Sequence, residues 1–247
     1  MGKLIDFKKF YQNILFADRF LKIARIFHFE KISWSLLNLE PRDKCLLLAP
    51  HPDDETVGCA GLLLKYPENF DVVCITDGRC GSYDHTPEET IDIRRREFEE
   101  AMEKFGISSY SFLNIEDRKL INNYSIFKSL DINDYDYILL PNYFDQNKDH
   151  KAVTVLLQKL LLNKKYKSGL KIVFYEVWSA LPLPNYFFDI SDVIENKKEL
   201  INLYQSQVKY VSFVDGIIGL NRYRGMQSNC HYSEAFSIID VKTFMKL

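Results

Sequence analysis

The chain has few of the features that would assign a protein to a class at once. Its 247 residues carry 32 basic and 34 acidic side chains, and the net charge of −2 gives no electrostatic basis for binding nucleic acid. No apolar run approaches the roughly 20 residues that span a membrane, and no signal peptide is recognisable, so we expect a cytoplasmic protein. The five cysteines form no C-x-x-C pair, so neither a disulfide framework nor a cysteine metal site is expected.

A glycine-rich dinucleotide-binding turn is missing as well. No G-x-G-x-x-G follows the first apolar strand, which argues against a nucleotide-binding Rossmann enzyme. In other respects the composition is that of an ordinary enzyme domain. Hydrophobic residues make up 47% of the chain, enough to bury one sizeable core without dividing it.

The remaining pattern is typical of alternating strands and helices. Short apolar runs bounded by turns predict strands, and longer runs with helical periodicity predict helices. Strands joined through helices lie parallel, with helices on both faces. We therefore expect an α/β fold, a Rossmann-like three-layer sandwich with a mostly parallel central sheet. The expected strands are 45–49, 70–75, 110–113, 137–140, 170–175 and 235–239, and the expected helices are 57–66, 88–105, 152–162 and 191–204.

The most informative segment follows the first strand and reads LLLAPHPDDE from residue 46 to residue 55. Two prolines flank His51, so the backbone turns and the apolar strand ends. The strand then presents His51, Asp53 and Asp54 at its carboxyl end, where open α/β sheets bind ligands. Imidazole nitrogen and carboxylate oxygen suit a divalent ion such as Zn²⁺. A neighbouring carboxylate outside the ligand set is free to accept a proton from metal-bound water.

A simpler interpretation is an acidic turn in which Asp54 or Thr56 caps the following helix. It leaves the histidine between two prolines, directly beside the acids, without an explanation. Capping and metal binding are compatible, so both interpretations stay open at this point.

The segment resembles the start of the PIG-L/LmbE-like family of zinc-dependent N-deacetylases, in which an apolar strand precedes (A/P)-H-P-D-D-E. Further family-like segments follow in the same order along the chain, over about residues 43–240. They are Thr76-Asp77-Gly78, Arg94-Arg95-Arg96-Glu97, Asp145 to His150 in place of D-x-H-x-D-H, Ser206-Gln207, and Arg224-Gly225 with Tyr232 to Phe236.

The resemblance implies a catalytic metal site. His51, Asp54 and His150 would bind one divalent ion, most simply Zn²⁺, and leave an open position for water. His150 is expected at the mouth of a helix that begins near residue 151. Asp53 would act as the general base.

One position departs from the family. The family has a second histidine three residues before the ligand His150, and this chain has Asn147 there. An asparagine amide can donate to a developing oxyanion, a role worth about 3 kcal/mol in other enzymes, but it cannot transfer a proton near neutral pH. His231 is the best substitute, and the alternative is that His231 is a partly buried, hydrogen-bonded histidine.

The function implied is removal of an acetyl group from an N-acetylated amino sugar that is free, nucleotide-linked or part of a glycoconjugate. Arg79 and Arg94 are candidates for contacting sugar hydroxyls or a phosphate, and Tyr143 and Trp178 for lining a sugar pocket. Surface arginines and core aromatic residues are the alternatives. Two rival functions are a deacylase of another N-acyl substrate, such as a glycopeptide or thiol-precursor conjugate, and a catalytically degenerate binding subunit.

Residues 1–36 are expected to form a basic amphipathic helical extension before a deacetylase-like domain at 37–247. Seven basic and three acidic residues give the extension a local charge of 7 − 3 = +4, and its aromatic residues recur at helical intervals. Such a helix either lies peripherally on an anionic membrane surface or buries its apolar face against the enzyme or a second copy.

Overall fold

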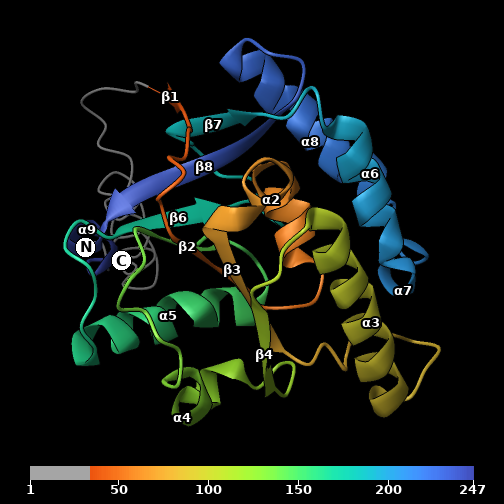
Figure 1. The fold of residues 1–247 in the computed structure, drawn as a ribbon. Helices are drawn as coiled ribbons and strands as arrows, with labels where there is room; N and C mark the ends of the chain where they lie inside the picture. The colour runs from red at the N-terminus through yellow and green to blue at the C-terminus, as the bar shows by residue number, and fades with distance from the viewer. Residues whose placement is uncertain (1–33) are drawn as a thin grey trace, which may run out of the picture.

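The structure is a computed structural model that describes residues 34–247. Its centre is an eight-stranded sheet with the strand order β1-β7-β8-β6-β5-β2-β3-β4 (Figure 1). β8 runs antiparallel to both of its neighbours, whereas the other neighbouring pairs are parallel. The strands are β1 (Ser35–Leu36), β2 (Cys45–Ala49), β3 (Phe70–Thr76), β4 (Tyr110–Ile115), β5 (Tyr137–Pro141), β6 (Lys171–Tyr175), β7 (Tyr186–Asp189) and β8 (Ser233–Asp240).

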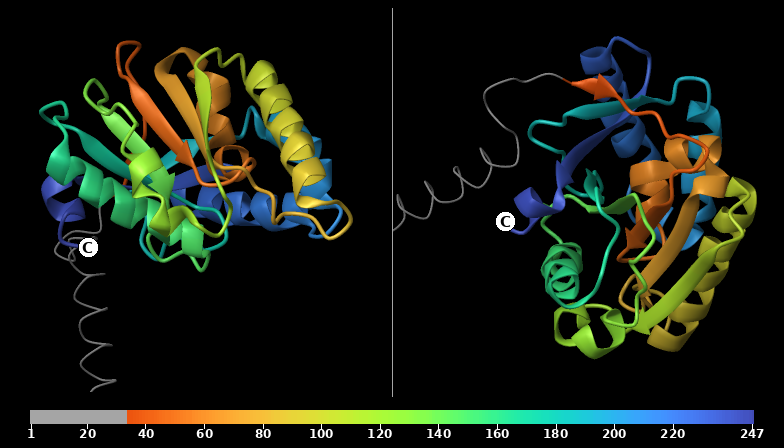
Figure 2. Two further views of the ribbon diagram at one scale, coloured as in Figure 1. Left: turned by 90° about the horizontal axis from the view of Figure 1, so that it is seen from below. Right: turned by 60° about the vertical axis from the view of Figure 1, so that its left-hand side comes forward.

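Helices cover both faces of the sheet (Figure 2). One hydrophobic core lies between the sheet and helices α2, α3, α6 and α8, and a second lies between the sheet and α4, α5 and α9. The predicted three-layer sandwich with a mostly parallel sheet is therefore confirmed. The helices are α2 (Asp54–Lys65), α3 (Pro87–Phe105), α4 (Tyr124–Phe127), α5 (Lys148–Asn163), α6 (Ile194–Leu203), α7 (Gln205–Val208), α8 (Phe213–Ser228) and α9 (Val241–Phe244), with 3-10 turns η1 (Pro67–Asn69) and η2 (Leu120–Asn122).

β2 is fully buried because it has a layer of helices on each side. Leu47 packs in one core, while Leu46 and Leu48 pack in the other, since successive side chains of a strand point to opposite faces. This arrangement explains why the strand is a continuous apolar run rather than an alternating one. β2 lies between β5 and β3, so the residues that follow it emerge beside the carboxyl ends of these two parallel strands.

Both helices that follow the site strands begin earlier than predicted from the periodicity. α2 begins at Asp54, and α5 begins at Lys148 rather than near residue 151. Asp54 and His150 therefore lie in the first turns of helices. Neither Asp54 nor Thr56 caps α2, because the N-cap residue is Asp53 and no side chain caps this helix.

The predicted N-terminal helical extension, residues 1–36, lies mostly outside the described residues. At its end Ser35 and Leu36 form strand β1 and not a helix, because they pair with β7. From residue 34 onward, the Trp34 ring contacts the ring of Phe187 at 5.6 Å between centroids, and β1 pairs with β7 at one edge of the sheet. Within the described part of the chain, no helix is long and apolar enough to cross a bilayer.

Candidate metal centre and active site

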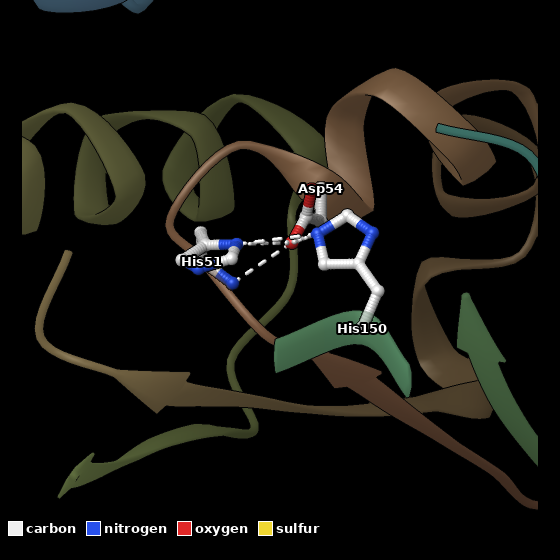
Figure 3. Close-up of side chains that lie close together, drawn as sticks. All are labelled: His51, Asp54 and His150. Carbon is white, nitrogen blue, oxygen red and sulfur yellow. Dashed lines mark hydrogen bonds and ion pairs between the residues drawn. The ribbon is translucent and has the colours of Figure 1, made fainter. Parts of the chain in front are cut away.

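Three side chains from neighbouring strands converge at the carboxyl edge of the sheet (Figure 3). His51 follows β2, Asp54 opens α2, and His150 lies in the first turn of α5 after β5. Because β2 and β5 are hydrogen-bonded neighbours, their ends bring these segments together. Nδ1 of His51 lies 3.2 Å from Nε2 of His150, and Oδ2 of Asp54 lies 3.2 Å and 3.1 Å from these two nitrogens. We call these three residues the ligand trio.

The spacing and chemistry of the ligand trio fit a divalent ion. Ligand atoms about 2.0–2.1 Å from a tetrahedral Zn²⁺ lie about 3.3 Å from one another, close to the separations found here. Two imidazole nitrogens and a carboxylate oxygen form a set that zinc prefers, and all three side chains are buried. Catalytic zinc sites use three protein ligands and keep one position open.

The carboxylate and the two imidazoles of the trio shift one another's pKa values. Burial opposes ionisation of Asp54, but the two imidazoles outweigh it and hold the pKa of this carboxyl well below its usual range. Burial lowers the pKa of His150, while Asp54 and Asp145 raise it to about 9. A metal ion requires an ionised carboxylate and neutral imidazoles, so binding would displace protons from the histidines.

Asp53 lies beside the trio and pairs with Arg94. Oδ2 of Asp53 is 3.0 Å from Nη2 of Arg94. Burial raises the pKa of Asp53 to about 6, and the arginine limits the rise. Arg94 is itself buried and also donates to the carbonyls of Pro52 and Gly78 at 2.9 Å and 3.3 Å. Its guanidinium therefore holds Asp53 and the turns on either side of the cleft.

A cleft of about 520 Å³ opens beside the trio. Six of the ten predicted site residues line it. His150 is fully buried behind the wall, with its ring directed at Asp54. The lining residues are His51, Asp53, Asp54, Cys80, Gly81, Arg94, Asp117, Arg118, Asn147, Lys148, Asp149, Trp178 and Gln207.

Three predicted substrate residues are not among the lining residues. Arg79 forms an ion pair with Asp77 at 2.7 Å. Tyr143 packs against the ring of Phe144, with 5.2 Å between centroids. His231 is exposed and lies beside Arg222 instead of the cleft. The structure thus brings together Arg94, Trp178, Asn147 and Asp53 with the trio, but not these three.

Asn147 is the N-cap residue of α5. Its side-chain oxygen accepts from the amide of Asp149 at 2.8 Å. The other end of the side chain, Nδ2, makes no hydrogen bond within residues 34–247, and Asn147 lines the cleft. The cap therefore uses the acceptor of this amide and leaves its donor available to a ligand.

Two acidic residues of the site were not assigned a role from the sequence. Asp117 Oδ1 and Asp149 Oδ2 lie 3.4 Å and 3.5 Å from Nε2 of His51, on the side of the ring away from the trio. Asp117 follows β4, so its position after a third parallel strand was an available signal. These carboxylates can hold the proton on Nε2 and so direct Nδ1 toward the metal position.

Comparisons with known proteins agree with this arrangement. The sequence profile described as PIG-L: GlcNAc-PI de-N-acetylase matches residues 46–161. N,N'-diacetylchitobiose deacetylase from Pyrococcus horikoshii has a similar structure, with a TM-score of 0.66 and 24% identity over 91% of this chain and 92% of that one. A deacetylase of the teicoplanin biosynthetic pathway has a TM-score of 0.60 and 15% identity, covering 79% of this chain and 98% of that one.

The same fold also occurs in a different kind of enzyme. The 4-carboxy-2-hydroxymuconate hydratase GalB from Pseudomonas putida has a TM-score of 0.64 and 18% identity, over 80% of this chain and 96% of that one. At such identities the likeness is one of fold, so function has to be argued from the site. The profile match contains the whole ligand trio together with Asp53 and Asn147. Residues 46–161 of this chain are a PIG-L family domain.

Proposed function

We propose that this protein is a zinc-dependent hydrolase that removes the acetyl group from an N-acetylated amino sugar. The observation that carries the proposal is the ligand trio at the wall of a cleft, with Asp53 beside it and outside the ligand set. The PIG-L family match and the deacetylases among the similar structures support this reaction over hydration.

The residues of the cleft have separate roles in this reaction. When held by the trio, Zn²⁺ would polarise the amide carbonyl and lower the pKa of water at the site. Asp53 accepts the proton of the attacking water. Nδ2 of Asn147 donates to the carbonyl oxygen as it gains negative charge. The C–N bond then breaks, and the proton held by Asp53 goes to the nitrogen, so that acetate and an amine leave.

The substrate class follows from the lining and from the names of similar proteins. Charged and amide side chains dominate the lining, which suits a ligand rich in hydroxyl groups. The exposed Trp178 adds an aromatic face at the wall of the cleft. The family profile is named for a GlcNAc derivative and one similar structure for N,N'-diacetylchitobiose, both N-acetylated sugars.

The test combines metal analysis with an acetate-release screen. The purified protein should contain close to one zinc ion per chain and should release acetate from at least one of free N-acetylglucosamine, its β-linked dimer, UDP-N-acetylglucosamine or a lipid-linked N-acetylglucosamine. Chelation should abolish the release, and added Zn²⁺ should restore it.

The same screen includes N-acyl peptides and an acylated glycopeptide. Acetate release from these alone would assign the protein to the alternative deacylase function. Full zinc occupancy with no release from any compound, but saturable binding of one of them, would identify a binding subunit and overturn the proposal.

A further inference from the structure

One buried carboxylate joins three parts of the cleft. Asp145 has no exposed surface and lies in the loop after β5. Its Oδ1 accepts from the amide of Asn147 at 2.9 Å. Its Oδ2 accepts from the amides of Trp178 and Ser179 at 3.0 Å and 3.2 Å. The same Oδ2 lies 3.4 Å from Nδ1 of His150. The side chain of Asp145 thus contacts the His150 ring and the backbone amides of Asn147 and Trp178.

The ring nitrogen of His150 that faces Asp145 lacks a hydrogen bond in the described part of the chain. Nδ1 of His150 is completely buried and has no hydrogen-bond partner within the described residues. It is the ring nitrogen opposite Nε2, which faces Asp54 and His51. If Nε2 binds a metal ion, Nδ1 must carry the ring proton, and Oδ2 of Asp145 is the acceptor in place for it.

The Trp178 loop lies between β6 and β7 and has two further buried anchors, Asn142 and Arg224. Nδ2 of Asn142 donates to the carbonyls of Ser179 and Ala180 at 3.1 Å and 3.3 Å. Arg224 donates to Oε1 of Glu176 at 2.5 Å and to the carbonyl of Leu181 at 2.7 Å. These bonds hold the two ends of the segment from residue 176 to 181. Between them, Trp178 is 52% exposed, and its ring lies 5.2 Å from that of Phe213. Within the described residues, the backbone of Trp178 itself makes one hydrogen bond, from its amide to Asp145.

We infer that Asp145 is a positioning residue that couples metal binding at His150 to the placement of Trp178, so that loading the metal sets the aromatic wall of the cleft. Because Oδ2 of Asp145 is shared between Nδ1 of His150 and two backbone amides, an ion that fixes the His150 ring through Nε2 also fixes this carboxylate. A shift of the carboxylate toward His150 changes its bonds to Trp178 and Ser179. The coupling is reciprocal: if metal binding stabilises one position of the Trp178 loop, that loop position also raises the affinity for the metal.

The inference rests on the metal site of the proposed function, but not on an acetylated sugar as the substrate. It can be tested with Zn²⁺ alone. The chain has two tryptophans, so Trp34→Phe leaves Trp178 as the sole tryptophan emitter. Titrating the metal-free Trp34→Phe protein with Zn²⁺ should shift the emission of Trp178, and the shift should saturate at one ion per chain.

Asp145→Asn in the Trp34→Phe background tests whether the effect of zinc on Trp178 passes through Asp145. This change places an amide NH₂ where one oxygen accepts hydrogen bonds, and we expect about a 10- to 100-fold loss of zinc affinity. At saturating zinc, the emission shift should be absent or much smaller. The matched control is Glu97→Gln, because Glu97 also accepts two hydrogen bonds, from the amide and hydroxyl of Ser206 near the cleft, without contacting a ligand residue. It should keep both the affinity and the shift.

The outcomes are distinguishable. Zinc binding by the Trp34→Phe protein without any change in Trp178 emission would overturn the inference and leave the proposed function standing. A full emission shift in zinc-saturated Asp145→Asn would show that the ion acts on Trp178 directly, which also overturns the inference. Absence of zinc binding in the Trp34→Phe protein itself would remove the metal site and with it the proposed function. The first of these results needs no Asp145 variant, so the test survives even if that variant does not fold.

Discussion

Nζ of Lys197 lies 2.8 Å from Oε1 of Glu234, and this buried ion pair is bonded into the backbone of helix α2. Lys197 donates to the carbonyl of Val57 at 2.9 Å, while Oε1 of Glu234 accepts from the amide of Gly61 at 2.8 Å. Val57 and Gly61 are four residues apart in α2, and in an α-helix the carbonyl of the first accepts from the amide of the second. Lys197 and Glu234 therefore bond the carbonyl and the amide of one helical turn. The ion pair ties α6 and β8 to the helix that begins with Asp54.

Removing one member of this pair should destabilise the fold strongly. Lys197→Met leaves the carboxylate of Glu234 buried without its cation, a loss of roughly 3–5 kcal/mol. Adding Glu234→Gln removes both charges and should recover part of the loss. Chemical denaturation followed by circular dichroism measures both effects.

The matched control for this change is Lys198→Met, at the next residue of α6. Lys198 lies at the surface and pairs with the exposed Glu195, so its removal should change the free energy of unfolding far less than Lys197→Met does. Equal stability of the Lys197→Met and Lys198→Met proteins would contradict the role assigned to the buried pair.

The second prediction concerns the metal ligands. His150→Ala should lose most bound zinc while keeping the fold, because two ligands of the trio remain but the third nitrogen is gone. Metal content after gel filtration, with circular dichroism as the check on folding, gives the answer. His231→Ala, which removes an exposed histidine outside the cleft, should retain full occupancy. Full zinc occupancy in the His150→Ala protein would exclude this ligand assignment.

Asp53→Asn should separate metal binding from chemistry. The change keeps the size of the side chain but removes the proton acceptor, so zinc content should stay near that of the parent and kcat should fall by roughly 10²–10⁴-fold. The control is Asp92→Asn on the exposed side of α3, which should leave kcat unchanged. An Asp53→Asn enzyme that works as well as the parent would mean that another group is the base.

Two substitutions separate the helix-capping role of Asn147 from its proposed role as a hydrogen-bond donor to the substrate. Asn147→Asp keeps an oxygen that caps α5 but replaces the free NH₂ donor, so stability should hold while kcat falls. Asn147→Ala removes both, so kcat should fall and the free energy of unfolding should drop by about 1 kcal/mol. Steady-state kinetics and denaturation, measured on the same samples, distinguish the effects.

Restoring the family histidine completes this series. Because imidazole is a poorer cap than an amide and Asn147 already supplies a donor, Asn147→His should leave acetate release unchanged or lower it. A faster Asn147→His enzyme, together with an unaffected Asn147→Ala enzyme, would show that asparagine is a loss and not an adaptation.

The central strands were predictable because burial on both faces leaves an unmistakable apolar run. β2 matches its predicted bounds, and α3, predicted over 88–105, spans Pro87–Phe105 with Thr86 as its N-cap. β7 and α8 were not predicted. β7 has only four residues, and α8 contains Gly216 and Gly219 with apolar side chains that do not keep to one face. Such segments are placed by contacts with the rest of the fold, which a single sequence does not contain.

The candidate site likewise contains residues whose positions the sequence predicts and residues whose positions it does not. The family resemblance pointed to His51, Asp54 and His150, and their closeness was predictable because each follows a strand whose end can be read from the sequence. Whether Tyr143 and His231 reach the cleft depends on the directions of side chains in loops, which no periodicity specifies. The hydrogen bond that makes Asn147 a cap and frees its NH₂ group also required the three-dimensional arrangement.

The strand order has a consequence for how the chain is assembled during synthesis. The parallel strands β2 to β6 come from one continuous stretch, whereas β1 pairs with β7, and Ser35 and its partner Tyr186 are 151 residues apart, from 186 − 35. Contacts between distant segments form late, because loop closure costs entropy. Asp54 and His150 are synthesised before Lys197 and Glu234, which hold α2. All three residues of the ligand trio are thus present in the nascent chain before β7 and β8 are synthesised.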